Sequence, residues 1–121
     1  MVQTKLSTCT ANIGEEIGQN LGAQFISAYR HAHPADVTAY YIGRNILEQV
    51  LAQPGCVGMH FYNAYNEKGE KTLVYVGVNA GGTDMLSVTA VNTKGQLDVQ
   101  KGIVADRAIV REDDEAKWWE F

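Results

Sequence analysis

Two side chains that can exchange protons stand two positions apart near the middle of the chain. His60 and Tyr62 alternate with Met59 and Phe61 within residues 57–62, which is the period of a β-strand. Side chains at that spacing lie on one face of a strand, so the imidazole and the phenol could form an acid/base pair beside a pocket. The same pattern fits a solvated strand face of mixed polarity, which favours a purely structural role.

A glycine-rich segment supplies a third residue of this kind. Residues 79–84 read Asn-Ala-Gly-Gly-Thr-Asp, without the Lys-Ser/Thr of a phosphate-binding loop and with too few carboxylates for a calcium loop. This composition is typical of a hairpin turn. We assign Asp84, together with His60 and Tyr62, to a candidate ligand pocket.

The remaining histidines and cysteines form no recognisable metal or redox motif. His31 and His33 make a His-x-His pair, but a zinc site needs three or four ligands, and nothing near them in the sequence completes the set. We expect these rings to contact free carbonyl groups at the end of a helix. Cys9 and Cys56 lack a Cys-x-x-Cys spacing, so we expect reduced, unbridged thiols, with Cys56 a small buried side chain. The sequence predicts no metal and no cofactor.

An amphipathic helix is predicted over residues 12–31, closed by Pro34. Its apolar residues recur every four positions and form one stripe: Ile13, Ile17, Leu21 and Phe25. Glycines with the same spacing interrupt it: Gly14, Gly18 and Gly22. Each glycine costs about 1 kcal/mol relative to alanine within a helix. They are explained either by close approach of another backbone or by a helix that is weak or begins later.

The acidic tail at residues 111–121 ends in large aromatic side chains. Trp118, Trp119 and Phe121 are seldom left in water, so we expect them to dock on the chain's own sheet or on a partner. With the three glycines, they are the candidate interface residues.

The rest of the chain predicts a second helix and then strands. Helix 44–53 is ended by Pro54-Gly55, and residues 37–42 before it are interpreted as extended. Strands are predicted at 57–62, 71–79, 84–91 and 96–100, with further short strand segments at 103–104 and 108–110. Because no helix lies between these strands, they should pair antiparallel. The sequence therefore predicts one α+β domain over residues 1–121, with an arm at 1–9 and two N-terminal helices on one face of a meander of about four strands.

Composition argues against several classes of function. The chain has 121 residues, 45% of them apolar, as is typical of one ordinary globular domain. Its net charge is −4, and its ten Lys and Arg are scattered, which disfavours nucleic-acid binding. No window resembles a membrane span or a signal peptide. We expect a soluble cytoplasmic protein.

Three segments carry a resemblance to a known family. Residues 46–62 read ILEQVLAQPGCVGMHFY, residues 73–79 read LVYVGVN, and residues 82–84 read GTD. This LAQPGCVG–strand–LVxVG–GxD pattern is similar to a family of small hypothetical bacterial proteins over roughly residues 25–106. The family has no assigned activity, so the resemblance implies a stand-alone bacterial domain and no catalytic residue. Its members often end in a Pro- and Cys-rich tail, which this chain replaces with acidic residues and tryptophan.

Two functions of different kinds remain. The first is a non-enzymatic binding or assembly module that forms a homodimer through the first helix, the aromatic tail or both, with an unidentified protein as a further candidate partner. The alternative is a small-molecule-binding domain or enzyme that uses His60, Tyr62 and Asp84. A continuous apolar surface would favour the first function, and a concave pocket with convergent polar groups would favour the second.

Overall fold

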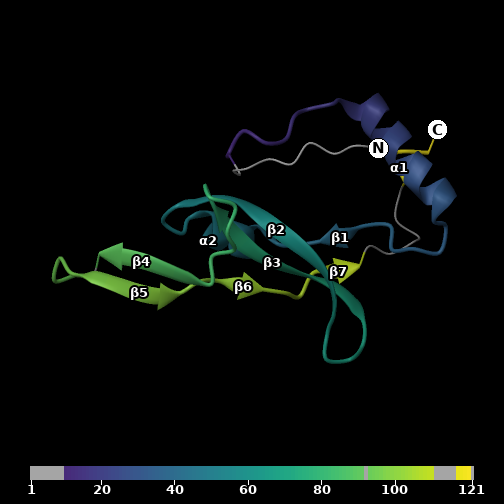
Figure 1. The fold of residues 1–121 in the computed structure, drawn as a ribbon. Helices are drawn as coiled ribbons and strands as arrows, with labels where there is room; N and C mark the ends of the chain where they lie inside the picture. The colour runs from purple at the N-terminus through teal and green to yellow at the C-terminus, as the bar shows by residue number, and fades with distance from the viewer. Residues whose placement is uncertain (1–9, 92, 111–116, 121) are drawn as a thin grey trace.

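The computed structural model of this chain describes residues 10–91, 93–110 and 117–120 (Figure 1). These residues form an α+β fold whose strands all pair antiparallel, as predicted. The helices are α1 (Gln19–Ala32) and α2 (Arg44–Leu51), and neither is long and apolar enough to cross a lipid bilayer. The strands are β1 (Tyr40–Tyr41), β2 (Cys56–Tyr65), β3 (Lys71–Asn79), β4 (Ser87–Val91), β5 (Leu97–Lys101), β6 (Val104–Ala105) and β7 (Ile109–Val110).

Helix α1 begins at Gln19 rather than at residue 12, which corrects the prediction. Gly14 has φ 112° and Gly18 has φ 80°, and neither value is compatible with a right-handed helix. Gly18 is the residue from which the helix starts, so only Gly22 lies within it. The three glycines therefore do not form a continuous row on one helix, because the first two belong to the irregular segment before α1.

Strand β3 is the central element, as predicted. It pairs with β2 along its whole length and with β6 at Tyr75 and Val76. Helix α2 packs over it at Gly77, where an added Cβ would lie 2.9 Å from Gln53 Nε2 and 3.3 Å from Val50 Cγ1. Val50 and Tyr75 are almost completely buried there. The core of the fold lies in this sandwich of α2 and β3.

A single meander of about four strands was predicted and is wrong, because the described strands form three separate sheets. Two different segments pair with the outer edge of β3. Asp84 bridges to Val78 and the N–H of Met85 donates to the carbonyl of Gly77, and further along β6 pairs with the same strand. Within the part of the chain that the structure describes, β4 and β5 pair only with each other and form an arm (Figure 1).

The arm leaves the sheet where two chain segments cross. The N–H of Gly102 donates to the carbonyl of Leu86 over 2.9 Å, and a Cβ at Gly102 would lie 1.7 Å from the carbonyl oxygen of Met85. A side chain at position 102 has no room against this backbone. The crossing therefore requires glycine.

Helix α1 stands apart from the three-stranded sheet, at the end of the molecule opposite the β4–β5 arm (Figure 1). The prediction that both helices cover one face of the sheet is therefore wrong for α1. The extended conformation predicted for residues 37–42 is confirmed at Tyr40 and Tyr41, which pair with β7. The predicted arm at residues 1–9 lies outside the described residues.

Candidate functional site

The structure brings the three predicted pocket residues together. His60 Nδ1 lies 2.6 Å from Asp84 Oδ1, and the Tyr62 hydroxyl donates to Asp84 Oδ2 over 2.5 Å. The imidazole and the phenol also meet edge to face, with ring centroids 5.9 Å apart. One carboxylate therefore holds both neighbouring rings, and we call this set of three residues the Asp84 cluster.

Two local features place these side chains. His60 and Tyr62 lie two residues apart on β2 and so share a face of the sheet. Asp84 follows a turn in which Asn79 Oδ1 accepts hydrogen bonds from the N–H groups of Gly81 and Thr83, at 3.0 and 3.1 Å. Such a side-chain turn fixes where the chain re-enters the sheet. The bridge to Val78 then sets Asp84 beside β3, within reach of the two rings.

The hydrogen bonds of the Asp84 cluster keep its carboxyl group ionised. Donation by Tyr62, and then by His60, holds the pKa of Asp84 below its ordinary value. The same hydrogen bond raises the pKa of the Tyr62 hydroxyl, with smaller contributions from burial and from the negative charge of Asp84. At neutral pH the cluster therefore contains a carboxylate and a neutral phenol.

An ionised Asp84 fixes the tautomer of His60. A carboxylate can only accept hydrogen bonds, so Nδ1 of the ring must carry a proton where it meets Asp84 Oδ1. In the neutral ring, Nε2 is then left with a lone pair. Among the described residues, no group makes a hydrogen bond to that atom. The cluster can accept a hydrogen bond at Nε2.

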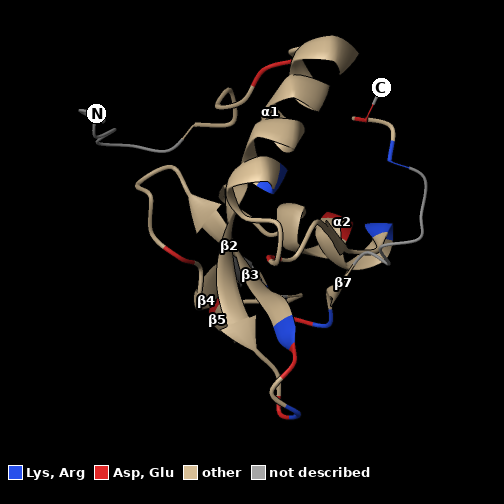
Figure 2. Ribbon diagram, turned by 90° about the vertical axis from the view of Figure 1, so that its right-hand side faces the viewer, with Lys and Arg blue, Asp and Glu red and all other residues tan. Residues whose placement is uncertain are grey.

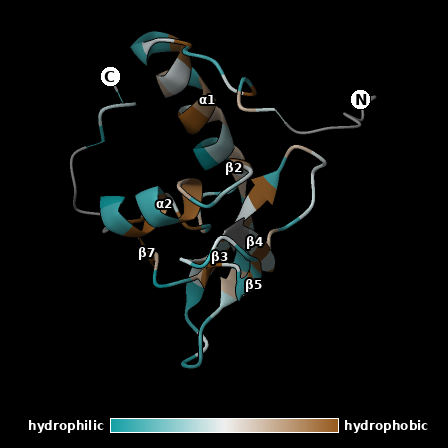
Figure 3. Ribbon diagram, turned by 90° about the vertical axis from the view of Figure 1, so that its left-hand side faces the viewer, coloured by the Kyte–Doolittle hydropathy of each residue, from teal (hydrophilic) through white to brown (hydrophobic). Residues whose placement is uncertain are grey.

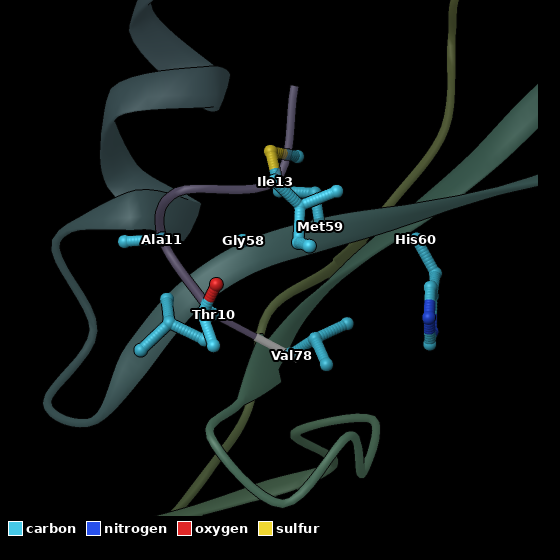
Figure 4. Close-up of a pocket in the computed structure, with 8 residues that line it drawn as sticks. Thr10, Ala11, Ile13, Gly58, Met59, His60 and Val78 are labelled. Atoms are coloured by element: carbon cyan, nitrogen blue, oxygen red, sulfur yellow. The ribbon is translucent and has the colours of Figure 1, made fainter. Parts of the chain in front are cut away.

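A pocket of about 280 Å³ lies beside His60 (Figure 4). It is formed where the segment before α1 passes the start of β2. Its lining is mostly apolar, with Ala11, Ile13, Val57, Met59 and Val78, and its polar residues are Thr10 and His60. No charged side chain is among its described lining residues. Sequence reasoning found His60 but missed the others, because no pattern in the sequence relates residues 10–13 to β2.

The aromatic tail docks on α1 rather than on the sheet. Trp119 is 5% exposed, and its carbonyl accepts a hydrogen bond from the Ser27 hydroxyl over 3.2 Å. Trp118 covers Gly22, where an added Cβ would lie 3.4 Å from its Cη2 atom. Gly22 is therefore covered by the chain's own tail and cannot receive another backbone. Of the other candidate interface residues, Gly14 and Gly18 lie before the helix and Phe121 lies outside the described residues.

One face of α1 remains exposed and apolar. Leu21, Phe25 and Tyr29 stand one turn apart and are 40%, 57% and 50% exposed. Ile17 and Trp118 adjoin them, since both reach the surface over Gly22. The only charged residue in α1 is Arg30, and the helix is accordingly tan along nearly its whole length in Figure 2. We call these five residues the α1 patch; Figure 3 shows apolar residues spaced along the same helix.

The other candidate residues are scattered. His31 Nδ1 lies 2.8 Å from the carbonyl oxygen of Ser27, one turn back, rather than against one of the last carbonyls of α1. The ring of His33 packs against Tyr29 at a tilt of 36°, with 4.6 Å between centroids. Cys56 is half-buried, not buried as predicted, and its Sγ donates to the Gly58 carbonyl. Cys9 lies outside the described residues.

Comparison of the chain with protein-family models, with curated proteins and with solved structures finds no match. The resemblance to small bacterial proteins stays a prediction. The function must therefore be argued from the Asp84 cluster and the α1 patch themselves.

Proposed function

We propose that this chain is a non-enzymatic assembly module that forms a homodimer through the α1 patch. The observation that carries the proposal is the exposed stripe of Leu21, Phe25 and Tyr29 on a helix whose opposite side is already covered by Trp119. A helix that is apolar on both sides is found where both sides are buried. A cytoplasmic location, expected from the sequence, belongs to the same proposal.

The size of the α1 patch fits a small dimer interface. Its five side chains are each between 40% and 57% exposed. If each contributes roughly 100 Å², two copies would bury about 1,000 Å² in total, which is near the lower limit of a specific interface. At about 25 cal/mol per Å² the gross gain is on the order of 25 kcal/mol, before the large costs of association and side-chain ordering.

The shape of the surface supports pairing of two identical copies. A shallow groove of about 280 Å³ runs beside Phe25 and is lined by Ile26, Tyr29, Arg30 and Thr38. In a two-fold contact, a projecting side chain and the groove next to it serve both copies reciprocally. Phe25 of each copy would then enter the groove of the other.

Light scattering after size exclusion at micromolar concentration tests this proposal. The wild-type chain should show twice its single-chain mass of 13.3 kDa. Phe25→Glu should be a monomer, because a carboxylate at the centre of an apolar interface would be buried without a partner. Its matched control is Gln24→Glu, which introduces the same charge on the neighbouring face of α1 and should remain a dimer. Circular dichroism verifies that both variants stay folded, as expected from the 57% exposure of Phe25.

Two results would contradict the proposal. A wild-type monomer at every concentration, unchanged by deleting residues 117–121, would rule out self-association. A Phe25→Glu variant that stays dimeric would show association through another surface. Strand β2 is the obvious one, because its outer edge has no partner strand among the described residues and the strand contains no charge and no proline.

A further inference from the structure

The unshared nitrogen of His60 is the most specific chemical feature outside the α1 patch. Nδ1 is committed to Asp84 at 2.6 Å, which leaves the lone pair of Nε2 without a hydrogen bond from any described residue. The ring cannot turn over without losing its bond to the carboxylate, and Tyr62 holds Asp84 from the other side at 2.5 Å. The acceptor at Nε2 is therefore pre-oriented.

The neighbouring pocket defines what such an acceptor could bind. Its volume of about 280 Å³ lies just below the range of about 300–1,000 Å³ that is usual for drug-sized ligands. It corresponds to about nine water molecules at roughly 30 Å³ each. Ile13, Val57, Met59 and Val78 give it apolar walls, and His60 stands at one end of the group (Figure 4). Small molecules with an apolar body and one polar end fit this description.

Charge selects the kind of polar end. The carboxylate of Asp84 lies against the opposite nitrogen of the His60 ring, and the described lining contains no lysine or arginine. An anion would meet the negative potential of Asp84, and the described lining offers it only the hydroxyl of Thr10 as a side-chain donor and no positive charge. An alcohol or an amine could donate to Nε2, and a protonated amine would gain further from the negative charge of Asp84.

We propose that this pocket binds a small apolar molecule carrying an O–H or N–H donor, which donates a hydrogen bond to Nε2 of His60. The binding is non-covalent and does not depend on self-association through the α1 patch. Tyr62 acts as a positioning residue, since it reaches the ligand only through Asp84. Alcohols and amines both carry such a donor, and the experiment below distinguishes between them.

Nuclear magnetic resonance titration with four butyl compounds tests the proposal on the full chain. The probes are n-butanol and n-butylamine as donors, and butyl methyl ether and butyrate as acceptors of similar length. The methyl group of Met59 and the Nε2 nitrogen of His60 report on the pocket. We expect at least one donor to shift both signals in a saturable manner, while the ether and butyrate shift neither at the same concentrations. A larger effect of n-butylamine than of n-butanol would identify the amine as the preferred class.

A matched pair of variants tests the imidazole. His60→Phe keeps an aromatic ring and removes both nitrogens, Nε2 and the Nδ1 that is bonded to Asp84, so donor affinity should fall about tenfold or more, since one lost hydrogen bond in a partly buried site has about that effect. His31→Phe makes the same exchange on α1 and should leave the titration unchanged. The proposal is overturned if no donor saturates, if ether or butyrate binds as well as butanol, or if His60→Phe binds like the wild type. Should His60→Phe fail to fold, the Nε2 shift in the wild type still decides the question.

Discussion

Two tyrosine–aspartate hydrogen bonds of the same form tie loop residues to regular elements. Tyr29 on α1 donates to Asp36, and Tyr62 on β2 donates to Asp84, each over 2.5 Å. In both pairs the hydrogen bond lowers the pKa of the carboxyl group and raises that of the phenol. Because each aspartate lies just after a chain reversal, its hydrogen bond helps to hold the segment that follows the turn.

The Asp84 cluster should give stability that disappears in acid. The folded-state pKa of Asp84 lies below the ordinary 3.8, so its contribution is full above that value and is lost as the pH falls through the folded pKa. Asp84→Asn should therefore be less stable than the wild type by about 1 kcal/mol at pH 7, allowing for solvent screening. The difference should shrink at pH values below 3.8. Urea unfolding of both proteins from pH 7 down to about pH 2.5 measures this difference, since a carboxylate's contribution is lost over the acid part of that range.

Asp98→Asn on the exposed strand β5 is the control for this measurement. It removes an equal charge and should differ little from the wild type at any pH. A gap between wild type and Asp84→Asn that stays constant or widens in acid would mean that the carboxylate of Asp84 is not the stabilising species.

Sequence reasoning worked for the Asp84 cluster because its members follow local rules. The alternation of residues 57–62 placed His60 and Tyr62 on one face, and turn chemistry placed Asp84 at the start of the next segment. The tautomer of His60 and the apolar pocket beside it were beyond such rules. Both depend on contacts between segments that are far apart in the sequence.

At the scale of elements, sequence patterns identified the strands but not which of them pairs with the outer edge of β3. Each hairpin was visible as two apolar runs around a glycine turn, and β3 was correctly predicted as central. Either β4 or β6 could pair with the outer edge of β3. Local sequence patterns favour β4, because it is the next strand along the chain. Residues 84–85 and β6 occupy that edge instead. The start of α1 was missed for another reason, since Gly14 and Gly18 adopt positive φ angles that periodicity does not register.

The packing of the tail on α1 predicts unequal roles for its two tryptophans. Trp119 is 5% exposed and Trp118 is 48% exposed. Trp119→Ala should lower the free energy of unfolding by about 3–5 kcal/mol, the range for a buried aromatic residue. Because Trp118 also belongs to the α1 patch, the two are compared in the monomeric Phe25→Glu background, where Trp118→Ala should cost only about 1–2 kcal/mol, since half of its surface is then in water. Urea denaturation followed by the circular dichroism of the helices compares them.

The two substitutions serve as controls for each other, because both remove the same side chain from adjacent positions. Equal losses, or a larger loss for Trp118→Ala, would contradict the docking of the tail on α1. A reduced helical signal in Trp119→Ala before the main transition would indicate that α1 detaches first, as expected for a helix that stands apart from the sheet.

At the scale of the whole molecule, apolar surface is distributed away from the core. The most buried side chains gather around β3, while the arm and α1 lie at opposite ends and each expose large apolar residues (Figure 1). On β5, Leu97 is 77% exposed and Val99 is 69% exposed. Folding of a single chain therefore leaves part of its apolar side-chain surface in water. Burial of this surface against a partner would contribute free energy to association.

If two copies share the α1 patch, thermal stability must depend on protein concentration, because mass action favours the folded dimer. For two chains of 121 residues each that unfold together, Tm should rise by about 3 °C for every tenfold increase in concentration. Phe25→Glu should show no such slope, whereas Gln24→Glu should keep it. Sodium sulfate should raise the wild-type Tm more than sodium chloride, since an apolar contact responds to excluded salts rather than to screening. Scanning calorimetry over two decades of concentration measures these slopes. A flat wild-type line, or an equal slope in Phe25→Glu, would be incompatible with a dimer formed through this helix.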